Sequence, residues 1–236
     1  MSAGFAVFVK TPGRSALKTR LAAGIGEAAA LAWYQLAATA VGEVVSAAVG
    51  PDSRAYWAVA ESEALDDPRW AGLPVLWQGA GGLGERMARV HDELIGRHGG
   101  GILLGADAPQ IDADDLQNAV AWLECDCAHS VLGPATDGGF WLFGSNRRQA
   151  RAAWNQVAYS QPDTAERFVA ALSAAGQWQR LRRLDDVDRA ADLVPCIAAL
   201  AALAEPTPAQ RRLLEYSLRL VEAASGPAAD APVAGR

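Results

Sequence analysis

The sequence is poor in cysteine, with three among 236 residues, at positions 125, 127 and 196. Three cysteines are too few for a disulfide framework. Cys125 and Cys127 are separated by a single residue, which is too close for a usual zinc knuckle, and no second Cys/His pair follows them. We therefore interpret the cysteines as small core or loop residues of a protein in a reducing cytoplasm.

The sequence also has no excess of positive charge. It carries 21 Lys and Arg against 27 Asp and Glu, a formal net charge of -6. This balance lacks the basic footprint of nucleic-acid-binding proteins, so we expect no nucleic-acid partner. Any anionic ligand must be held by local positive groups, because the overall field does not attract it.

Long apolar runs are absent from the places where targeting segments occur. The opening residues, MSAGFAVFVKTPG, contain no basic segment followed by a long apolar stretch, so we expect no signal peptide. The apolar run over Cys196–Ala204 is far too short to cross a bilayer. We therefore expect a cytoplasmic protein without a membrane span.

What is present is an alternation of apolar strands and helices. Strands are predicted at 5–9, 54–60, 73–77, 101–104, 128–132, 140–143 and 179–184. Helices are predicted at 28–49, 85–97, 112–124, 147–154, 164–175, 188–203 and 208–224. This order favours an α/β sandwich with a mainly parallel sheet. We predict one domain over 1–224, whose peripheral last helix could serve an oligomer interface, and a disordered tail over 225–236.

Two charged residues follow predicted strands, where α/β sheets bind their ligands. The first is Lys10, and the loop after it also carries Lys18 and Arg20. A loop of small residues with Lys and Arg can hold a diphosphate, although it is not the G-x-x-x-x-G-K-[ST] pattern. The alternative is a cationic loop that simply faces solvent.

The second strand-end residue is Asp107, in GILLGADAP, and three further acids are candidates with it: Asp137, Asp186 and Asp188. Mg²⁺ and Mn²⁺ take one or two carboxylates from a protein and complete their shell with phosphates. The alternatives are that Asp107 only ends its strand and that Asp188 caps its own helix.

A glycine-rich turn, QGAGGLGERM over 78–87, opens the helix predicted at 85–97. Such a turn can seat a base or a phosphate, although it is not G-x-G-x-x-G after a strand. The alternative is a flexible connection between a strand and a helix.

Five segments, in this order and spacing, carry a family resemblance: FVKTPGRSALKTRLA, GLGERM, ILLGADAPQI, LGPATDGGFWLFG and LDDVDRAADL. They resemble bacterial glycosyltransferase A-type proteins of the nucleotide-diphospho-sugar transferase superfamily, some of them linked to arsenosugar biosynthesis. They are also similar to the molybdenum-cofactor and phospholactate nucleotidyltransferases. The resemblance covers about residues 5–195 and implies a three-layer α/β/α sandwich, a nucleotide donor and a divalent metal, Mg²⁺ or Mn²⁺.

The resemblance also implies roles for residues. Asp107 matches the acid that holds the metal, and Asp186 or Asp188, the latter preferred, is the candidate second ligand. The candidate nucleotide or substrate contacts are Lys10, Lys18, Thr19, Arg20, Gly82, Leu83, Gly84, Gly138 and Gly139. Lys18 would assist departure of the diphosphate, and Asp137 is the candidate general base. The chain departs from the family at Arg14 and Ser15, where many members have Pro-Gly, and it lacks a D-x-D pair.

Three activities agree with these features. The first is glycosyl transfer from a nucleoside-diphosphate sugar to a small-molecule acceptor. The second is nucleotidyl transfer from a nucleoside triphosphate with release of pyrophosphate. The third is a non-catalytic module that binds a nucleotide. The fold alone does not separate them, because function depends on the site.

Overall fold

The computed structural model describes residues 2–50, 53–172 and 176–225. Its centre is a seven-stranded sheet in the order β3-β2-β1-β4-β6-β5-β7. The strands are β1 (Ser2–Val9), β2 (Arg54–Val59), β3 (Val75–Trp77), β4 (Gly99–Gly105), β5 (His129–Pro134), β6 (Phe140–Ser145) and β7 (Gln177–Arg180). Only β6 pairs antiparallel with its neighbours in the described sheet, so the sheet is mixed and mainly parallel, as predicted.

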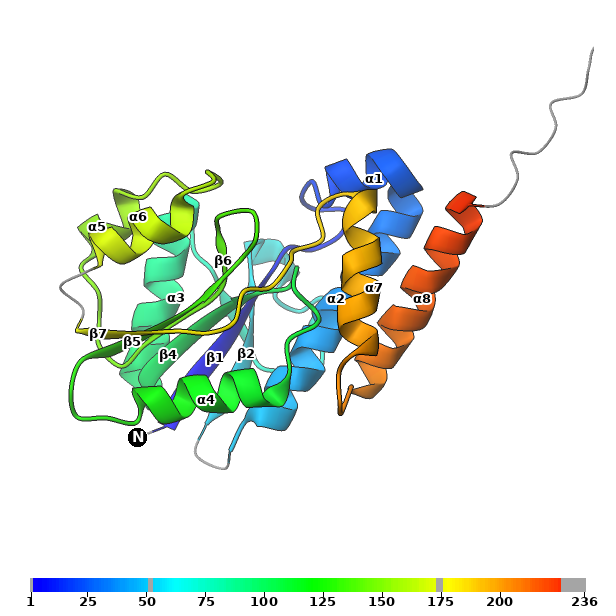
Figure 1. Cartoon of the computed structure of the whole chain (residues 1–236). Helices are drawn as coiled ribbons and strands as arrows, with labels where there is room; N and C mark the ends of the chain where they lie inside the picture. Colours follow the sequence, from blue (N-terminus) through cyan, green and yellow to red (C-terminus); the bar gives the residue numbers. More distant parts are fainter. Residues whose placement is uncertain (1, 51–52, 173–175, 226–236) are drawn as a thin grey trace, which may run out of the picture.

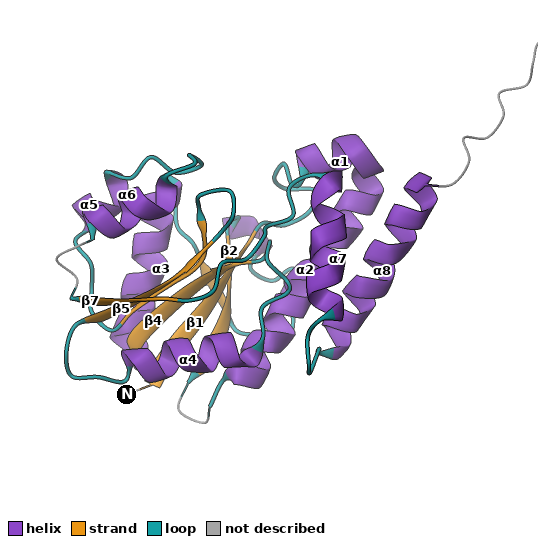
Figure 2. Cartoon of the chain, viewed as in Figure 1, coloured by secondary structure: helices purple, strands orange, loops and turns teal. Residues whose placement is uncertain are grey.

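Helices cover both faces of the sheet (Figure 2). They are α1 (Thr19–Ile25), α2 (Glu27–Ala48), α3 (Leu83–His98), α4 (Ala113–Leu123), α5 (Arg151–Asn155), α6 (Thr164–Ala171), α7 (Leu193–Ala201) and α8 (Pro208–Ser225). One core lies between the sheet and α2 and α4, and a second lies between the sheet and α3, α5 and α6. A third joins α1, α2, α7 and α8 at one end of the molecule (Figure 1). The predicted three-layer sandwich is confirmed.

The sequence of β1 explains how both faces are covered. Phe5 and Val7 are fully buried in the core under α2 and α4, while Ala6 between them faces the α3 side. Burying a side chain such as Phe or Val contributes about 2 kcal/mol. On the α3 side Gly4 is small because the helix is close: a Cβ at Gly4 would lie 2.5 Å from the His98 ring.

One helix of the described chain, α2, is long and apolar enough to cross a membrane by length and composition alone. Here it packs between the sheet and α8, and 56% of its most apolar window is buried inside the protein. A core helix of a globular protein passes the same test, so this helix adds nothing in favour of a membrane span.

Three predicted elements were displaced, each by polar side chains. The helix predicted at 147–154 begins only at Arg151, because the buried Asn146 amide donates to three carbonyls at the end of α4 and in the α4–β5 connection and fixes the chain there. The strand predicted at 179–184 lies instead at 177–180, and beyond it Arg182 turns toward Asp112 and Asp115.

The helix predicted at 188–203 begins at Leu193. The Asp192 carboxylate accepts the backbone N–H groups of Asp188 and Arg189, which keeps Asp188 outside the helix. The sequence analysis missed α1. Of the predicted tail, only Ser225 is described, as the end of α8, and 226–236 lie outside the described residues, as do 173–175 of the helix predicted at 164–175.

The topology gathers the candidate residues at one edge of the sheet. Lys10, Gln78 and Asp107 follow the parallel strands β1, β3 and β4, so all three lie at the carboxyl edge. Because β6 runs in the opposite direction, its first residue, Phe140, lies at the same edge. This edge is where α/β sheets bind ligands.

Candidate functional site

A cavity of about 590 Å³ opens at this edge. Three cations line it, Lys10, Lys18 and Arg86, which we call the basic wall. Asp137, Phe140, Tyr159, Gln161 and Asp186 line it from the segments after β5, and we call them the acidic wall. Asp107 and Asp188 lie at the junction. A volume of this size suits a ligand as large as a nucleotide.

Lys18 is the centre of the charged cluster. Its side chain is only 5% exposed, and its Nζ lies 2.8 Å from Oδ1 of Asp107 and 3.6 Å from Oδ1 of Asp188. The same ammonium donates to the carbonyl of Val187 and lies over the Trp33 ring. Lys18 adopts a left-handed backbone conformation, φ 45°, directly before α1. A non-glycine residue in this region is uncommon, and such conformations gather at functional sites.

The loop that carries Lys18 is held by residues from the β2–β3 connection. The buried Glu61 carboxylate accepts the N–H of Thr11 at 2.9 Å and the hydroxyl of Ser15. The Trp70 indole N–H donates to the Thr11 hydroxyl at 3.0 Å. These bonds join positions about 50 residues apart, so they fix the loop against the rest of the fold.

Lys10 begins the same loop, and its backbone N–H donates to the Tyr34 hydroxyl at 2.8 Å. Burial raises the pKa of Tyr34, so this hydroxyl stays neutral. The Lys10 side chain is exposed and, within the described residues, has no ion-pair partner. It is therefore available to an anionic ligand.

The third cation, Arg86 of α3, donates to the amide oxygen of Gln78 at 3.3 Å, and Gln78 donates to the carbonyls of Val9 and Ala58. The Nε of Arg86 is buried without a hydrogen-bond partner. A buried unpaired donor is costly unless a ligand pairs with it, which suits a site that binds a polar molecule.

The carboxylates of the cavity repel one another. Burial, followed by the negative charges of Asp137, Asp188 and Asp107, raises the pKa of Asp186 to about 6. Asp107 and Asp188 are 49% and 46% exposed and share the ammonium of Lys18, and Asp188 also pairs with the exposed Arg20. The site thus holds more negative than positive charge around one point, which favours an added cation.

These acids fit the divalent metal that the family resemblance implies. Among the described residues, no three Asp, Glu, His or Cys side chains lie close enough together to hold an ion by themselves. Mg²⁺ and Mn²⁺ do not need three, because phosphate and water oxygens complete their shell. Asp107 and Asp188, half-exposed and facing the phosphate-sized space beside Lys18, provide that number of ligands.

The acidic wall is built by two loops that dock on each other. The β5–β6 turn places Gly138 at φ 91°, and its carbonyl accepts the N–H of Ala165 at the start of α6. A Cβ at Gly138 would lie 1.9 Å from the carbonyl oxygen of Pro162, so only glycine fits. Asp137 is exposed, and its Oδ1 accepts the N–H of Gly139 at 2.7 Å.

The structure brings most of the predicted site residues to this cavity. Those that line it are Lys10, Lys18, Leu83, Asp107, Asp137, Gly139 and Asp188. Five others, Thr19, Arg20, Gly82, Gly84 and Gly138, are not part of its lining. Arg20 is 66% exposed and pairs with Asp188 at 3.3 Å, while Gly84 lies against the Trp154 carbonyl, where it lets α3 pack. Asp112 caps α4, because its side chain accepts the N–H of Asp115.

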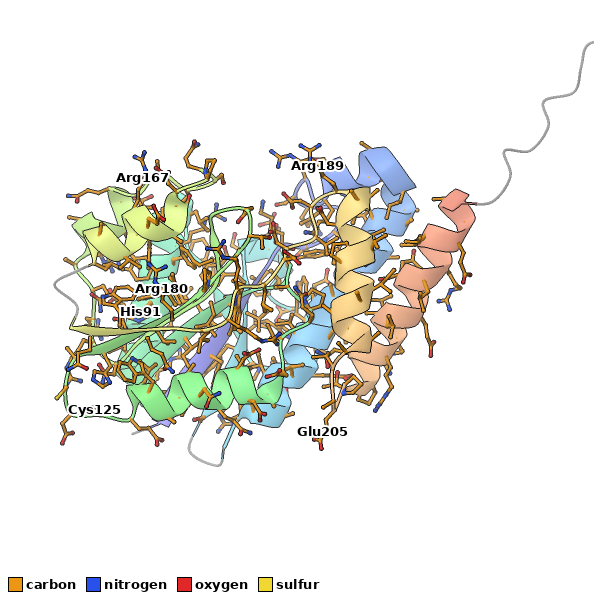
Figure 3. The ribbon with its side chains drawn as sticks, viewed as in Figure 1. His91, Cys125, Arg167, Arg180, Arg189 and Glu205 are labelled. Atoms are coloured by element: carbon orange, nitrogen blue, oxygen red, sulfur yellow. The ribbon has the colours of Figure 1, made fainter. Side chains whose placement is uncertain are left out.

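Sequence reasoning missed several lining residues, chiefly Tyr34, Arg86, Phe140, Tyr159 and Gln161. The sequence did offer an indication for Phe140, because this residue starts a predicted strand directly after the turn that carries Asp137. Tyr34 and Tyr159 had none, because they reach the cavity from helix α2 and from the loop after α5. The cysteines are free thiols, and Cys125 lies at the opposite end of the sheet from Arg167 and Arg189 (Figure 3).

A family model covers the part of the chain that carries strands β2 to β6. The model described as "Uncharacterized protein conserved in bacteria (DUF2064)" matches residues 35–161, more than half of the chain. The chain belongs to the DUF2064 family. The match includes Asp107 and Asp137 and leaves out Lys10, Lys18 and Asp188. No curated protein matches the sequence.

Solved structures show which fold this DUF2064 protein has. A proposed nucleotide-diphospho-sugar transferase from Desulfovibrio desulfuricans G20 superposes with a TM-score of 0.79 at 22% identity, over 94% of this chain and 97% of that one. CMP:2-keto-3-deoxy-manno-octonic acid synthetase, solved with CTP, superposes with a TM-score of 0.50 at 13% identity, over 85% and 99%. The fold is that of the nucleotide-diphospho-sugar transferases, as the motifs led us to expect.

Proposed function

We propose that this DUF2064 protein is a metal-dependent glycosyltransferase that uses a nucleoside-diphosphate sugar. The observation that carries the proposal is the Lys18 ammonium held between Asp107 and Asp188 in a nucleotide-sized cavity at the carboxyl edge of the sheet. A preset positive charge beside two metal-binding carboxylates suits a leaving diphosphate, whose negative charge grows as the sugar departs.

Each wall would then have its own task. Lys10 and Lys18 would hold the diphosphate, and Arg86 with Gln78 would meet the nucleoside part of the donor. A divalent ion held by Asp107 and Asp188 would supply a Lewis acid for the diphosphate oxygens. Asp137, exposed at the cavity and fixed by its bond to Gly139, is the candidate base for the acceptor hydroxyl. Catalysis would come mainly from positioning and charge stabilisation.

Nucleotidyl transfer is the second candidate. It is favoured by the three cations of the basic wall, which is as many as a triphosphate can use. The similar fold of a synthetase solved with CTP agrees with it. In that reaction the same cations would stabilise attack on the α-phosphate.

One panel separates the candidates. Nucleoside triphosphates and nucleotide sugars are tested with Mg²⁺ or Mn²⁺ for thermal shift and for product. Nucleoside diphosphate released from a sugar donor supports glycosyl transfer, and pyrophosphate released from a triphosphate supports nucleotidyl transfer. Binding without turnover across the panel favours a module that only binds nucleotide and contradicts both transfer reactions.

The metal assignment is tested with Asp107→Asn. We expect its nucleotide affinity in Mg²⁺ to fall at least roughly tenfold, since even supporting residues of metal sites cost that much. Its affinity without metal should not fall, because the change removes a negative charge next to the phosphates. Titration calorimetry with and without metal measures both. Asp114→Asn, an exposed acid in the first turn of α4 outside the cavity, is the matched control. An unchanged metal dependence in Asp107→Asn would contradict the assignment.

A further inference from the structure

The positive and negative side chains that line the cavity come from different segments of the chain. The three cations that line the cavity, which form the basic wall, come from the β1 loop and from α3. The part contributed by the segments after β4 carries Asp107, Asp137, Asp186 and Asp188. Among the described residues that line the cavity, these later segments contribute no Lys, Arg or His.

None of the four arginines near these acids in sequence, Arg167, Arg182, Arg183 and Arg189, is part of the cavity lining, and two of them pair with acids elsewhere. Arg167 of α6 pairs with Asp163 at 2.7 Å and points away from the fold (Figure 3). Arg182, which follows β7, donates to Asp112 and Asp115 at the start of α4. Neither is part of the cavity lining, so neither offsets the acids that face it.

Asp186 and Asp137 come together because two segments are joined by backbone bonds. The Thr136 N–H donates to the Leu184 carbonyl, and Val187 donates to the carbonyl of Asp107. The chain at 184–188 therefore runs from the β5–β6 turn to the Lys18 cluster, with Asp186 between them. These backbone bonds hold the segments that carry the two acids against each other.

We propose that the acidic wall is the acceptor subsite and that it admits only acceptors without an anionic group: neutral hydroxyl compounds or amines. The proposal rests on the proposed glycosyl transfer. A phosphate or carboxylate placed among Asp137 and Asp186 meets like charge without a compensating cation, which is unfavourable in a partly buried cavity. The rings of Phe140 and Tyr159 give the same wall an apolar surface, which suits a sugar face or an amine.

The first test measures anion binding. The protein is saturated with nucleoside diphosphate and Mg²⁺, so that the basic wall is filled, and inorganic phosphate is titrated by calorimetry. We expect no saturable binding to wild type. Asp137→Lys should bind phosphate at least roughly tenfold more tightly than wild type, because one charge within the cavity has changed sign.

Two further variants keep this test decisive. Asp137→Asn retains an oxygen for the Gly139 N–H, so it preserves the turn if Asp137→Lys unfolds it, and it should gain phosphate affinity in the same direction. Glu124→Lys makes the same charge change at the far end of α4, outside the cavity, and should gain nothing. Saturable phosphate binding to wild type, or no gain in either Asp137 variant, overturns the proposal.

The second test uses wild-type turnover with matched acceptors, such as glycerol with glycerol 3-phosphate and glucose with glucose 6-phosphate. We expect the uncharged member of a pair to stimulate release of nucleoside diphosphate more than the phosphorylated member. The reverse preference overturns the proposal. If no sugar donor releases nucleoside diphosphate, the proposed glycosyl transfer fails, while the phosphate titration still decides whether the wall rejects anions.

Discussion

The two walls of the cavity differ in how the fold builds them. The basic wall carries its charge at a strand end, on the loop that follows and on α3, and side chains from distant segments hold that loop, as Glu61 holds Thr11. The acidic wall is fixed mainly by backbone bonds between two loops, as between Gly138 and Ala165. A substitution of one side chain can therefore remove one of the bonds that hold the basic wall. The acidic wall instead depends on backbone conformations that only glycine adopts readily, as at Gly138.

The largest effect should follow from removing the charge at the centre of the basic wall. Lys18→Met keeps an unbranched chain in the same space and leaves Asp107 and Asp188 without their shared cation. We expect turnover to fall about 100-fold or more, the cost of losing one preset stabilising donor. Steady-state kinetics with the donor found in the panel measures it. Arg219→Met, on the remote helix α8, is the control and should stay near wild type. A loss below tenfold in Lys18→Met would remove Lys18 from the mechanism.

A smaller effect, on stability, should follow in the acidic wall from Gly138→Ala. The new Cβ meets the Pro162 carbonyl at 1.9 Å in addition to the strain of φ 91°. We expect the free energy of unfolding to fall by at least roughly 2 kcal/mol, with donor affinity little changed. Gly72→Ala separates the two causes, because Gly72 has φ 95° with nothing within 4 Å of its Cβ. Urea unfolding and nucleotide titration provide the readouts. Equal costs at both glycines would show that loop docking adds nothing.

The smallest effect should come from loosening the loop of the basic wall with Glu61→Gln. One amide oxygen then replaces two carboxylate oxygens that accept from Thr11 and Ser15. We expect a loss of about 1–3 kcal/mol in unfolding free energy and a several-fold weaker nucleotide affinity. Glu63→Gln, exposed in the same connection, should change neither quantity beyond about 0.5 kcal/mol. If Glu61→Gln lowered stability but left nucleotide affinity intact, the loop geometry would not matter for binding.

Much of the candidate site was accessible to sequence reasoning because it lies at strand ends. Lys10 and Asp107 each follow an apolar run, and the carboxyl ends of parallel strands meet at one edge. The acidic wall was less accessible. Asp137 stood out in its turn, but nothing in the sequence indicated that the loop at 159–164 would dock against that turn, because docking depends on contacts between segments far apart in the chain.

The sequence also did not indicate which polar side chains bond backbone groups and so shift the ends of helices. Asn146 and Asp192 each move the start of a helix by bonding backbone groups. Their effect depends on which backbone groups the tertiary structure places within reach, so helical periodicity alone predicted the wrong starts.

The alternation of apolar strands and helices was enough to predict the layered α/β fold, and the motifs were enough to predict the family. The sequence did not show that Lys18 lies between Asp107 and Asp188, which are 89 and 170 positions away. It also did not show that Arg20 lies outside the cavity lining and that the lining cations and most of the lining acids come from different segments. The physical reason is that local periodicity records which residues are buried, whereas the partner of a buried charge is set by how distant segments meet.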